Sequence, residues 1–551
     1  MSEASTTFGI DLGTTYSCIS YLKDGHPTVC LSLEGDHTTP SVVRMMLEDP
    51  EPVAGMTAKQ TSILYPNDTI DFVKRKIGKV KEFEIGDPEN RRTVTPEQVS
   101  AEILKKLAHD AEQDSGRPVK DVVITVPAYF GNNEKEATKE AGKLAGLNVV
   151  SLVEEPTAAA FYYLCEKEDS DATVCVFDLG GGTFDVTAIK KQGNEIRVIT
   201  TDGNHELGGK DWDDVLMKHM EAKFREKTNI DPDEDLGSDF QQDLQLNCET
   251  AKKQLTQATQ ASIVLKTDNK HMANLTITRD EFDALTSSLL QTAIDLTRNV
   301  FDKVAEYGEK IDKLLMVGGS SKMPQVRAAL TENFGSEVDE ILLNDPDMSV
   351  SKGACIYCAW RMAQAGNAVA TEGSQQVGES EITGTEVNEE TGTVIYTLKG
   401  QDGETYKSEV SLLPGSVQNL VIKTVATKSF GIMTLKRDTN EEQITNLIIK
   451  DTVLPFETSQ AFGTHTDNMT DISIELYQSE VDQKYYDPEF GSVIGKSVLT
   501  GLPAGLPADT PVTIHFKLNE EGIIEITGSY NGSPLNGRLD TSFAEGVGRS
   551  Q

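Results

Sequence analysis

Two stretches decide the fold of this chain: Gly-Ile-Asp-Leu-Gly-Thr-Thr at 9–15 and Phe-Asp-Leu-Gly-Gly-Gly-Thr at 177–183. Each closes an apolar, strand-like run with an aspartate, Asp11 or Asp178, and continues through a glycine turn into another strand-like run. Such an echo is expected where two similar halves of a domain face one cleft. The stretches therefore predict a two-lobed domain that uses the same turn twice.

The chemistry of these turns points to a phosphate ligand. Glycine lets the backbone approach a ligand without a Cβ in the way, and successive N–H groups form an anion-binding nest. An aspartate at the strand end can hold the water ligands of a magnesium ion. A third glycine turn, Val317–Ser321, suits the nucleoside end. One such turn is most often only a tight turn, but three in one region favour a nucleotide site. The P-loop pattern is absent, so the phosphate grip is of another kind.

The region from Thr7 to about Ala363 alternates strand-like and helical runs, which predicts an α/β architecture. Thr95 is placed to cap a helix whose first residue is Pro96. The clearest expected elements are the strands Val119–Val126 and Thr173–Asp178 and the helices Pro96–Gln113 and Asn133–Ala145.

Beyond Ala363 the composition changes. Residues Ala365–Glu390 are rich in Gly, Ser, Thr, Glu and Gln, which is typical of a linker or a flexible excursion. A hairpin is expected next, with strands Val394–Leu398 and Thr405–Val410. From Leu420 to about Ile526, short apolar segments alternate with turn residues and predict an all-β sandwich.

The composition excludes several classes of function. The chain has 551 residues and a formal net charge of -37, which disfavours nucleic acid as a partner. It has no apolar run of membrane-spanning length and does not begin like a signal peptide, so we expect a cytoplasmic protein without a membrane partner. Cys355 and Cys358 have the spacing of a redox or zinc motif, but they lie in an expected helix, Gly353–Met362, without a second pair.

Several further motifs occur at matching places along the chain. Together with 9–17 and 178–186, they make the chain resemble the seventy-kilodalton heat-shock chaperones, the DnaK-like family; they are Val126–Phe130, Glu155–Ala160, Leu207–Asp211, Val317–Pro324, Asp467–Asn468 and Leu499–Pro503. The resemblance implies an α/β two-lobed actin-like ATPase with ribonuclease H-like halves, followed by a β-sandwich that holds extended apolar peptides. The domains expected on this basis are an ATPase at 1–364, an inserted segment with a hairpin at 365–418, a sandwich at 419–541 and a tail at 542–551.

The resemblance also implies site residues. Asp11, Asp178 and Asp185 would organise Mg²⁺, K⁺ and the attacking water, with Lys74, Glu155 and Thr183 as further catalytic groups. Phosphoryl transfer depends mainly on positioning and charge neutralisation, which these groups supply. Pro127 matches a hinge. The remaining ATP-binding positions would be Gly13, Thr14, Thr15, Tyr16, Gly180, Gly181, Gly182, Gly209, Asp211, Glu249, Lys252, Lys253, Gly318, Gly319, Ser320, Lys322 and Asp347.

Six residues of the sandwich fall on the family's peptide-binding cleft: Ile432, Leu435, Phe462, His465, Ile472 and Ile474. An extended peptide offers backbone hydrogen bonds and an apolar side chain for a dry pocket. The alternative is that these residues are simply sandwich core. The resemblance implies unfolded peptides, a J-domain cochaperone and a nucleotide-exchange factor as partners.

The chain departs from the family pattern in four places. It ends soon after the sandwich, so we expect no helical lid, and the stretch Gly78–Thr95 is short. Asn419–Lys423 keeps the linker's apolar triplet without its aspartates, and Lys253 and Lys322 replace arginines that stack on adenine, which predicts weaker nucleotide binding.

The preferred interpretation is an ATP-hydrolysing, peptide-binding chaperone. The alternative is a nucleotide-binding regulator or co-chaperone scaffold for one dedicated protein partner. A small-molecule kinase of the actin-like superfamily is a weaker third reading, because no acceptor pocket is evident.

Overall fold

The computed structural model divides the chain into two compact units. The first comprises the described parts of 1–128, 138–196 and 202–421, and the second those of 129–137, 197–201 and 422–551. The structure describes residues 5–540 except 47–50, 88, 90, 167–170, 233–235, 268–270, 373–374, 389–392, 412–416, 418, 437, 440, 536 and 538. The predicted tail, 542–551, lies outside the described residues.

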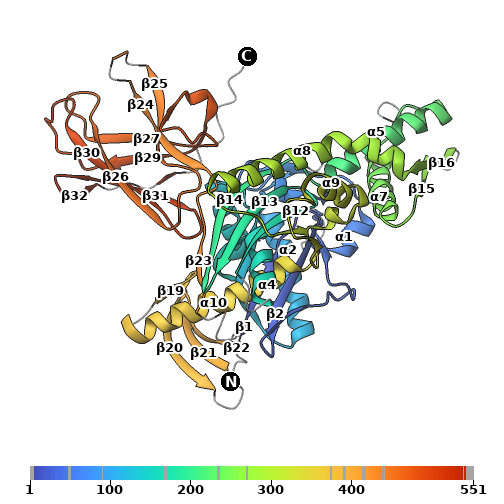
Figure 1. The fold of residues 1–551 in the computed structure, drawn as a ribbon, viewed down its shortest axis with the longest axis horizontal. Coiled ribbons are helices and arrows are strands. Elements are labelled where there is room, and N and C mark those ends of the chain that lie inside the picture. The colour runs from blue at the N-terminus through green and yellow to red at the C-terminus, as the bar shows by residue number, and fades with distance from the viewer. Residues whose placement is uncertain are drawn as a thin grey trace. The chain divides into compact units, whose positions relative to one another are not determined.

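A mixed ten-stranded sheet forms one half of the first unit (Figure 1). In its centre β1 (Ser5–Asp11) pairs in parallel with β10 (Val119–Val126) and antiparallel with β2 (Tyr16–Lys23). β10 continues in parallel to β11 (Asn148–Glu154), and β2 continues antiparallel to β3 (His26–Val29). The predicted strand Val119–Val126 is confirmed.

A second sheet repeats this strand order. β12 (Ala172–Leu179) pairs antiparallel with β13 (Phe184–Gln192) and in parallel with β17 (Lys313–Val317). Outside them lie β18 (Glu340–Leu343) and β14 (Glu195–Asn204). The order β18-β17-β12-β13-β14 matches β11-β10-β1-β2-β3 strand for strand. The echo in the sequence therefore corresponds to a repeated topology, with a glycine turn after the first strand of each half.

The helices of the first unit include α10 (Ser349–Glu372) and α2 (Pro96–Ser115). α2 begins at the predicted Thr95 cap: the Thr95 hydroxyl accepts the Gln98 N–H, and the Gln98 side chain accepts the Thr95 N–H. α10 packs closely on β1, since a Cβ added at Gly9 would overlap the backbone of Cys355. The others are α1 (Met56–Thr61), η1 (Val73–Arg75), α4 (Glu155–Glu166), α5 (Gly209–Thr228), α7 (Ser238–Leu255), α8 (Arg279–Glu306), η2 (Gly319–Lys322) and α9 (Pro324–Phe334), while α3 (Asn132–Leu144) begins in the second unit and ends in the first.

Short strands complete this unit. β4 (Thr39–Pro40) pairs with β2, and a hairpin is formed by β15 (Gln260–Thr267) and β16 (His271–Thr278). Two small sheets contain β5 (Val43–Arg44), β6 (Val53–Ala54) and β7 (Thr69–Ile70), and β8 (Phe83–Ile85) and β9 (Arg92–Val94).

The predicted flexible excursion at Ala365–Glu390 is wrong. α10 runs on to Glu372, and β19 (Gln375–Val377), β20 (Ser380–Asn388), β21 (Thr393–Lys399) and β22 (Thr405–Ser411) extend the first sheet, with β22 parallel to β1. The segment is polar on average, but its strands contain apolar residues that are buried in the fold. Examples are Val377, Ile382, Tyr396 and Leu398. The predicted hairpin is confirmed as β21–β22.

The described part of 422–540, the larger part of the second unit, is built from strands. One sheet has the order β28-β25-β24-β27-β29-β33 and the other β26-β30-β31-β32. Apolar residues of both sheets, among them Phe430, Leu476 and Phe516, form one core. The described part of 422–540 contains no α-helix, only the single turn η3 (Pro488–Phe490). The strands are β24 (Ser429–Leu435), β25 (Glu442–Ile448), β26 (Phe456–Gly463), β27 (Asp471–Ser479), β28 (Tyr485–Tyr486), β29 (Ser492–Thr500), β30 (Pro511–Leu518), β31 (Ile524–Tyr530), β32 (Ser533–Leu535) and β33 (Leu539–Asp540), and β23 (Val421–Lys423) begins in the first unit.

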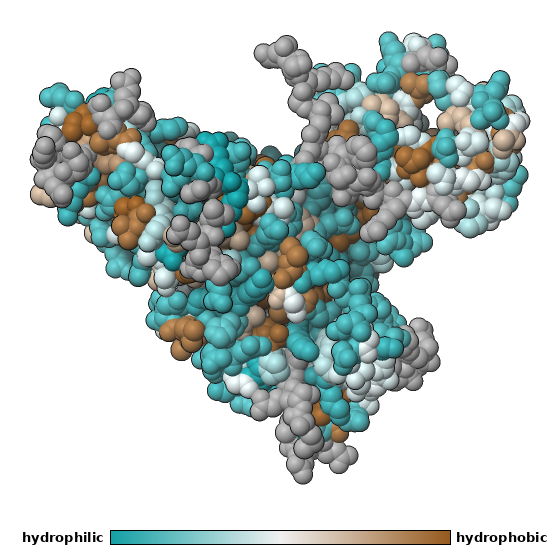
Figure 2. All heavy atoms as spheres, turned by 180° about the vertical axis from the view of Figure 1, so that it is seen from behind, coloured by the Kyte–Doolittle hydropathy of each residue, from teal (hydrophilic) through white to brown (hydrophobic). Residues whose placement is uncertain are grey.

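The surface shown in Figure 2 carries apolar residues scattered among hydrophilic ones. Among the described helices, none combines the length and the hydropathy that crossing a bilayer requires.

Candidate functional site

A cavity of about 580 Å³ opens between the two halves of the first unit. All three predicted glycine turns contribute to its wall, together with α7. The predicted residues that line it are Asp11, Gly13, Thr14, Thr15, Tyr16, Lys74, Glu155, Asp178, Gly180, Gly181, Thr183, Glu249, Lys252, Lys253, Gly318, Gly319, Ser320, Lys322 and Asp347.

The first two glycine turns lie against each other and against the start of α5. The Gly209 N–H donates to the Gly180 carbonyl at 3.0 Å, and the Lys210 N–H donates to the Gly181 carbonyl at 2.8 Å. A Cβ added at Gly208 would come within 2.6 Å of the Gly182 nitrogen, so the approach requires glycine. The turns therefore form one backbone cradle, which suits a polyanion.

Four buried charged groups converge at the floor of the cavity. The Lys74 ammonium contacts the Glu155 carboxylate, and both side chains are at most 10% exposed. Burial and the charge of Glu155 raise the pKa of Asp11 to about 7. The same two causes raise the pKa of Asp178 well above its usual value, and Asp185, its cross-strand neighbour, adds to the effect. The floor thus has three carboxyl groups, those of Asp11, Glu155 and Asp178, and one ammonium group. A bound cation would stabilise the ionised carboxylates.

Arg75, the neighbour of Lys74 in η1, reaches across to the second half. Its Nε and Nη2 donate to the Gly182 carbonyl at 2.9 and 2.7 Å, and its guanidinium pairs with Asp211. Asp211 in turn accepts the Gly208 N–H at 2.8 Å. The guanidinium thereby holds the second glycine turn and the start of α5 in one geometry.

Replacing Arg75 with lysine is expected to weaken the binding of a triphosphate to this cradle by roughly tenfold, because an ammonium cannot form this planar, forked set of bonds. Displacement of a fluorescent nucleotide measures the change. Arg91→Lys is the matched control, since the pair of Arg91 with Glu84 is exposed. Equal affinities of the two variants would show that Arg75 does not organise the cradle.

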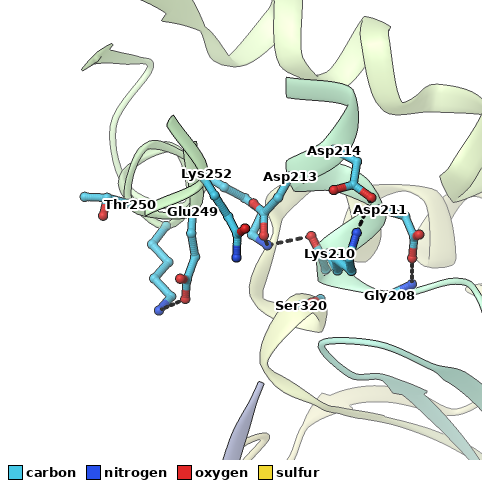
Figure 3. Close-up of polar contacts among 12 residues, drawn as sticks. Gly208, Lys210, Asp211, Asp213, Asp214, Glu249, Thr250, Lys252 and Ser320 are labelled. Atoms are coloured by element: carbon cyan, nitrogen blue, oxygen red, sulfur yellow. Dashed lines mark hydrogen bonds and ion pairs between the residues drawn. The ribbon is translucent and has the colours of Figure 1, made fainter. Parts of the chain in front are cut away.

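The end of the cavity that the sequence predicts for the nucleoside is bordered by α7 and α5 (Figure 3). Lys252 and Asp213 point toward each other from these helices, 2.7 Å apart, and Lys252 also donates to the Gly209 carbonyl at 2.7 Å. Burial raises the pKa of Asp213 to about 6.

A second ionic cluster on α7 joins Glu249 to two lysines and Tyr16. Lys59 and Lys253 contact the two carboxylate oxygens of Glu249 at 2.5 and 2.7 Å. Burial alone would raise the pKa of Glu249, but the two ammonium groups lower it to about 2. Glu249 therefore stays ionised, and the cluster stays paired, throughout the physiological pH range.

Asp213 should give stability a distinctive pH dependence. Because its folded-state pKa lies above the usual 3.8, the folded chain binds the extra proton, and stability rises as pH falls from 7 toward 4. Between pH 7 and 5, wild type should gain about 1 kcal/mol relative to Asp213→Asn, measured by urea unfolding at both pH values. Asp339→Asn, at an exposed carboxylate away from Asp213, is the control and should behave as wild type. A parallel pH response of wild type and Asp213→Asn would contradict the prediction.

Four predicted residues do not line the cavity. Each of them lies next to lining residues or contacts them; they are Gly182, Asp185, Gly209 and Asp211. The structure adds lining residues that the sequence reasoning missed: Ser17, Cys18, Asp36, Thr38, Met56, Asp213, Thr256, Gln257, Met323, Pro346 and Val350. Most of them carry no motif of their own. Ser17 and Met323 lie inside motifs already used, and Asp213 follows the predicted Asp211 by two residues, so these three were within reach of sequence reasoning.

The six predicted peptide-binding residues lie at different depths of the second unit. Ile432 and Ile474 are each 5% exposed and belong to the core, and Phe462 and Ile472 pack against it partly buried. Leu435 is 40% exposed, and His465 is exposed as well. The arrangement leaves Leu435 and His465 as the members with the most accessible surface.

One comparison with known proteins bears on this site. The profile of the family described as "Hsp70 protein" matches residues 7–369 and 407–545. The unmatched internal segment, 370–406, holds β19, β20 and β21, three of the four strands that extend the first sheet. The match includes all three glycine turns, the floor of the cavity and nearly all of the second unit. The chain belongs to the Hsp70 family, whose members are ATP-dependent chaperones.

Proposed function

We propose that this chain binds and hydrolyses ATP between two actin-like lobes, and that the nucleotide controls the binding of extended apolar peptides by a β-sandwich. One observation carries the proposal. Asp11 and Asp178 stand at equivalent strand ends of two sheets with the same strand order, and both line the cavity that holds the Lys74–Glu155 pair.

Each group of the cavity has a definite task in this proposal. The backbone N–H groups of the cradle and the hydroxyls of Thr14, Thr15 and Thr183 bind phosphate oxygens. The Lys74 ammonium neutralises charge that develops on the transferred phosphoryl group. Glu155 holds that ammonium in place, and the floor carboxylates orient the attacking water.

The carboxylates also fit a hydrated cation. Asp11 and Asp178 have raised pKa values because they are buried beside other negative charges, and a cation relieves both effects. No three His, Cys, Asp or Glu side chains within the described residues are grouped as direct metal ligands. Magnesium normally keeps several waters and shares the substrate's phosphates, so it requires no such group. Mg²⁺ would supply charge neutralisation on the phosphates, and K⁺ is proposed as a second cation at this floor.

A short segment connects the cavity to the sandwich along the chain. β10 carries Thr125, whose hydroxyl donates to Asp11 at 3.4 Å, and after Pro127 the chain enters 129–137 of the second unit. There Lys428 lies 3.4 Å from the centroid of the Tyr129 ring, and the Lys135 ammonium donates to the Glu521 carbonyl at 2.8 Å. This continuity supports a peptide site that responds to the nucleotide.

The test is the dissociation rate of a fluorescent apolar peptide with and without ATP, in wild type and in Lys74→Ala. Faster release with ATP in wild type supports coupled sites. Binding of peptide without any response to ATP would overturn the coupling and leave only the two separate activities.

The second candidate is a nucleotide-binding scaffold for one dedicated protein partner. The burial of Ile432 and Ile474 favours it, because those side chains offer a peptide little apolar surface. Failure of unrelated apolar peptides to bind in the experiment above would support this candidate.

A further inference from the structure

The nucleoside end of the cavity offers a base almost nothing to stack on. Its described lining includes no arginine, phenylalanine, tryptophan or histidine, and Tyr16 is its one aromatic ring. Stacking on an aromatic ring is worth about 1–3 kcal/mol per base, and a guanidinium plane serves in the same way. Selectivity for one base therefore depends on Tyr16 and on hydrogen bonds to the base edge.

The side chain of Tyr16 already contacts two lysines. The ammonium groups of Lys59 and Lys253 lie 4.7 and 4.5 Å from the centroid of its ring. Both ammoniums also donate to its hydroxyl at 2.8 Å, and the hydroxyl lies 3.1 Å from Glu249. A base that stacked on this ring would have to displace two paired lysines from a partly buried carboxylate.

The two lysines at this end are held in ion pairs. Lys253 is held by Glu249, and Lys322 is paired with Asp347. An ammonium is a compact point charge without a flat face, so neither lysine provides a stacking surface even when its stem lies beside the base.

The two polar side chains that follow α7, Thr256 and Gln257, do not select one base either. The Thr256 hydroxyl donates to the Lys253 carbonyl at 2.7 Å, which leaves its oxygen as an acceptor. Gln257 is exposed and carries both an acceptor oxygen and a donor NH₂. An amide that can turn satisfies the amino group of adenine or cytosine and the carbonyl of guanine or uracil alike.

We infer that the cavity accepts purine and pyrimidine nucleoside triphosphates with similar affinity, because it recognises the triphosphate rather than the base. The inference rests on the proposed nucleotide site and deepens it by naming the substrate class.

The test is displacement of a fluorescent ATP analogue, labelled on its ribose, from the full chain by ATP, GTP, CTP and UTP in the presence of Mg²⁺. The four dissociation constants should agree within about tenfold. An advantage of ATP greater than that over both GTP and CTP would overturn the inference while the nucleotide site stands. Failure of the analogue itself to bind would overturn the proposed function and the inference together.

Two variants test the cause. Lys253→Arg and Lys322→Arg each add a planar group, which should tighten ATP by about fivefold more than CTP, whose ring is smaller. Lys310→Arg, on an exposed lysine outside the cavity, is the control and should bind all four nucleotides as wild type does. An unchanged ratio of ATP to CTP affinity in both variants would contradict the inference.

Discussion

Replacing Lys74 with methionine is expected to lower the rate of ATP hydrolysis by about 10²–10³-fold, as loss of a preorganised charge in a dry site typically does. Methionine keeps most of the side-chain volume and removes the only ammonium at the cavity floor that contacts Glu155 in the described structure. The cradle that would hold the phosphates is not altered, so ATP should still bind. Single-turnover hydrolysis with saturating enzyme measures the chemical step, and displacement of a fluorescent nucleotide measures binding.

Loss of stability is the main competing explanation for an inactive variant. Breaking a buried ion pair from one side costs about 3–5 kcal/mol, because it leaves a buried charge without a partner. Lys74→Met with Glu155→Gln removes both charges and should recover most of the stability without recovering hydrolysis. Lys81→Met, on an exposed lysine, should leave both properties unchanged. Hydrolysis by Lys74→Met within about threefold of wild type would show that the pair is structural.

The repeated topology could be predicted from the sequence because its determinants are local. A strand, an aspartate and a glycine turn recur at 9–15 and 177–183. Each of these pieces predicts its local structure without reference to distant residues. Thr95 followed by Pro96 likewise marked the start of α2 to the residue. The inserted strands could not be predicted. Ile382 and Leu398 are isolated apolar residues in a polar stretch, and they become buried only because the strands that carry them extend a sheet whose other strands are distant in sequence.

The same limit applies to the cavity. The glycine turns and Lys74 could be placed by motif, but the partners that set their charges are tertiary. Nothing local connects Arg75 to Gly182, 107 residues away, or Lys59 to Glu249, 190 residues away. The peptide-binding residues illustrate a further limit, since alternation along a strand does not distinguish a cleft from a core. Ile432 and Ile474 were expected at a cleft, and they lie in the core of the second unit.

Phe516→Ala should have the largest effect on the stability of the second unit, a loss of about 3–5 kcal/mol. Phe516 is 1% exposed and lies on β30, where it contributes to the core between the two sheets. The matched control is Phe490→Ala, the same substitution at a side chain that is 63% exposed, for which we expect a change within about 0.5 kcal/mol. Urea unfolding followed by far-ultraviolet circular dichroism measures the free energy of unfolding of both variants.

The same variant tests whether a peptide binds beside the core of the second unit. Ile432 and Ile474 share the core with Phe516, so a cavity left at Phe516 removes packing partners from the residues expected beside the peptide. If those isoleucines contribute to binding, Phe516→Ala should weaken peptide affinity even at temperatures where the unit stays folded, whereas Phe490→Ala should not. A variant that is destabilised as expected but binds peptide with wild-type affinity would place the peptide away from this core, at the exposed residues such as Leu435.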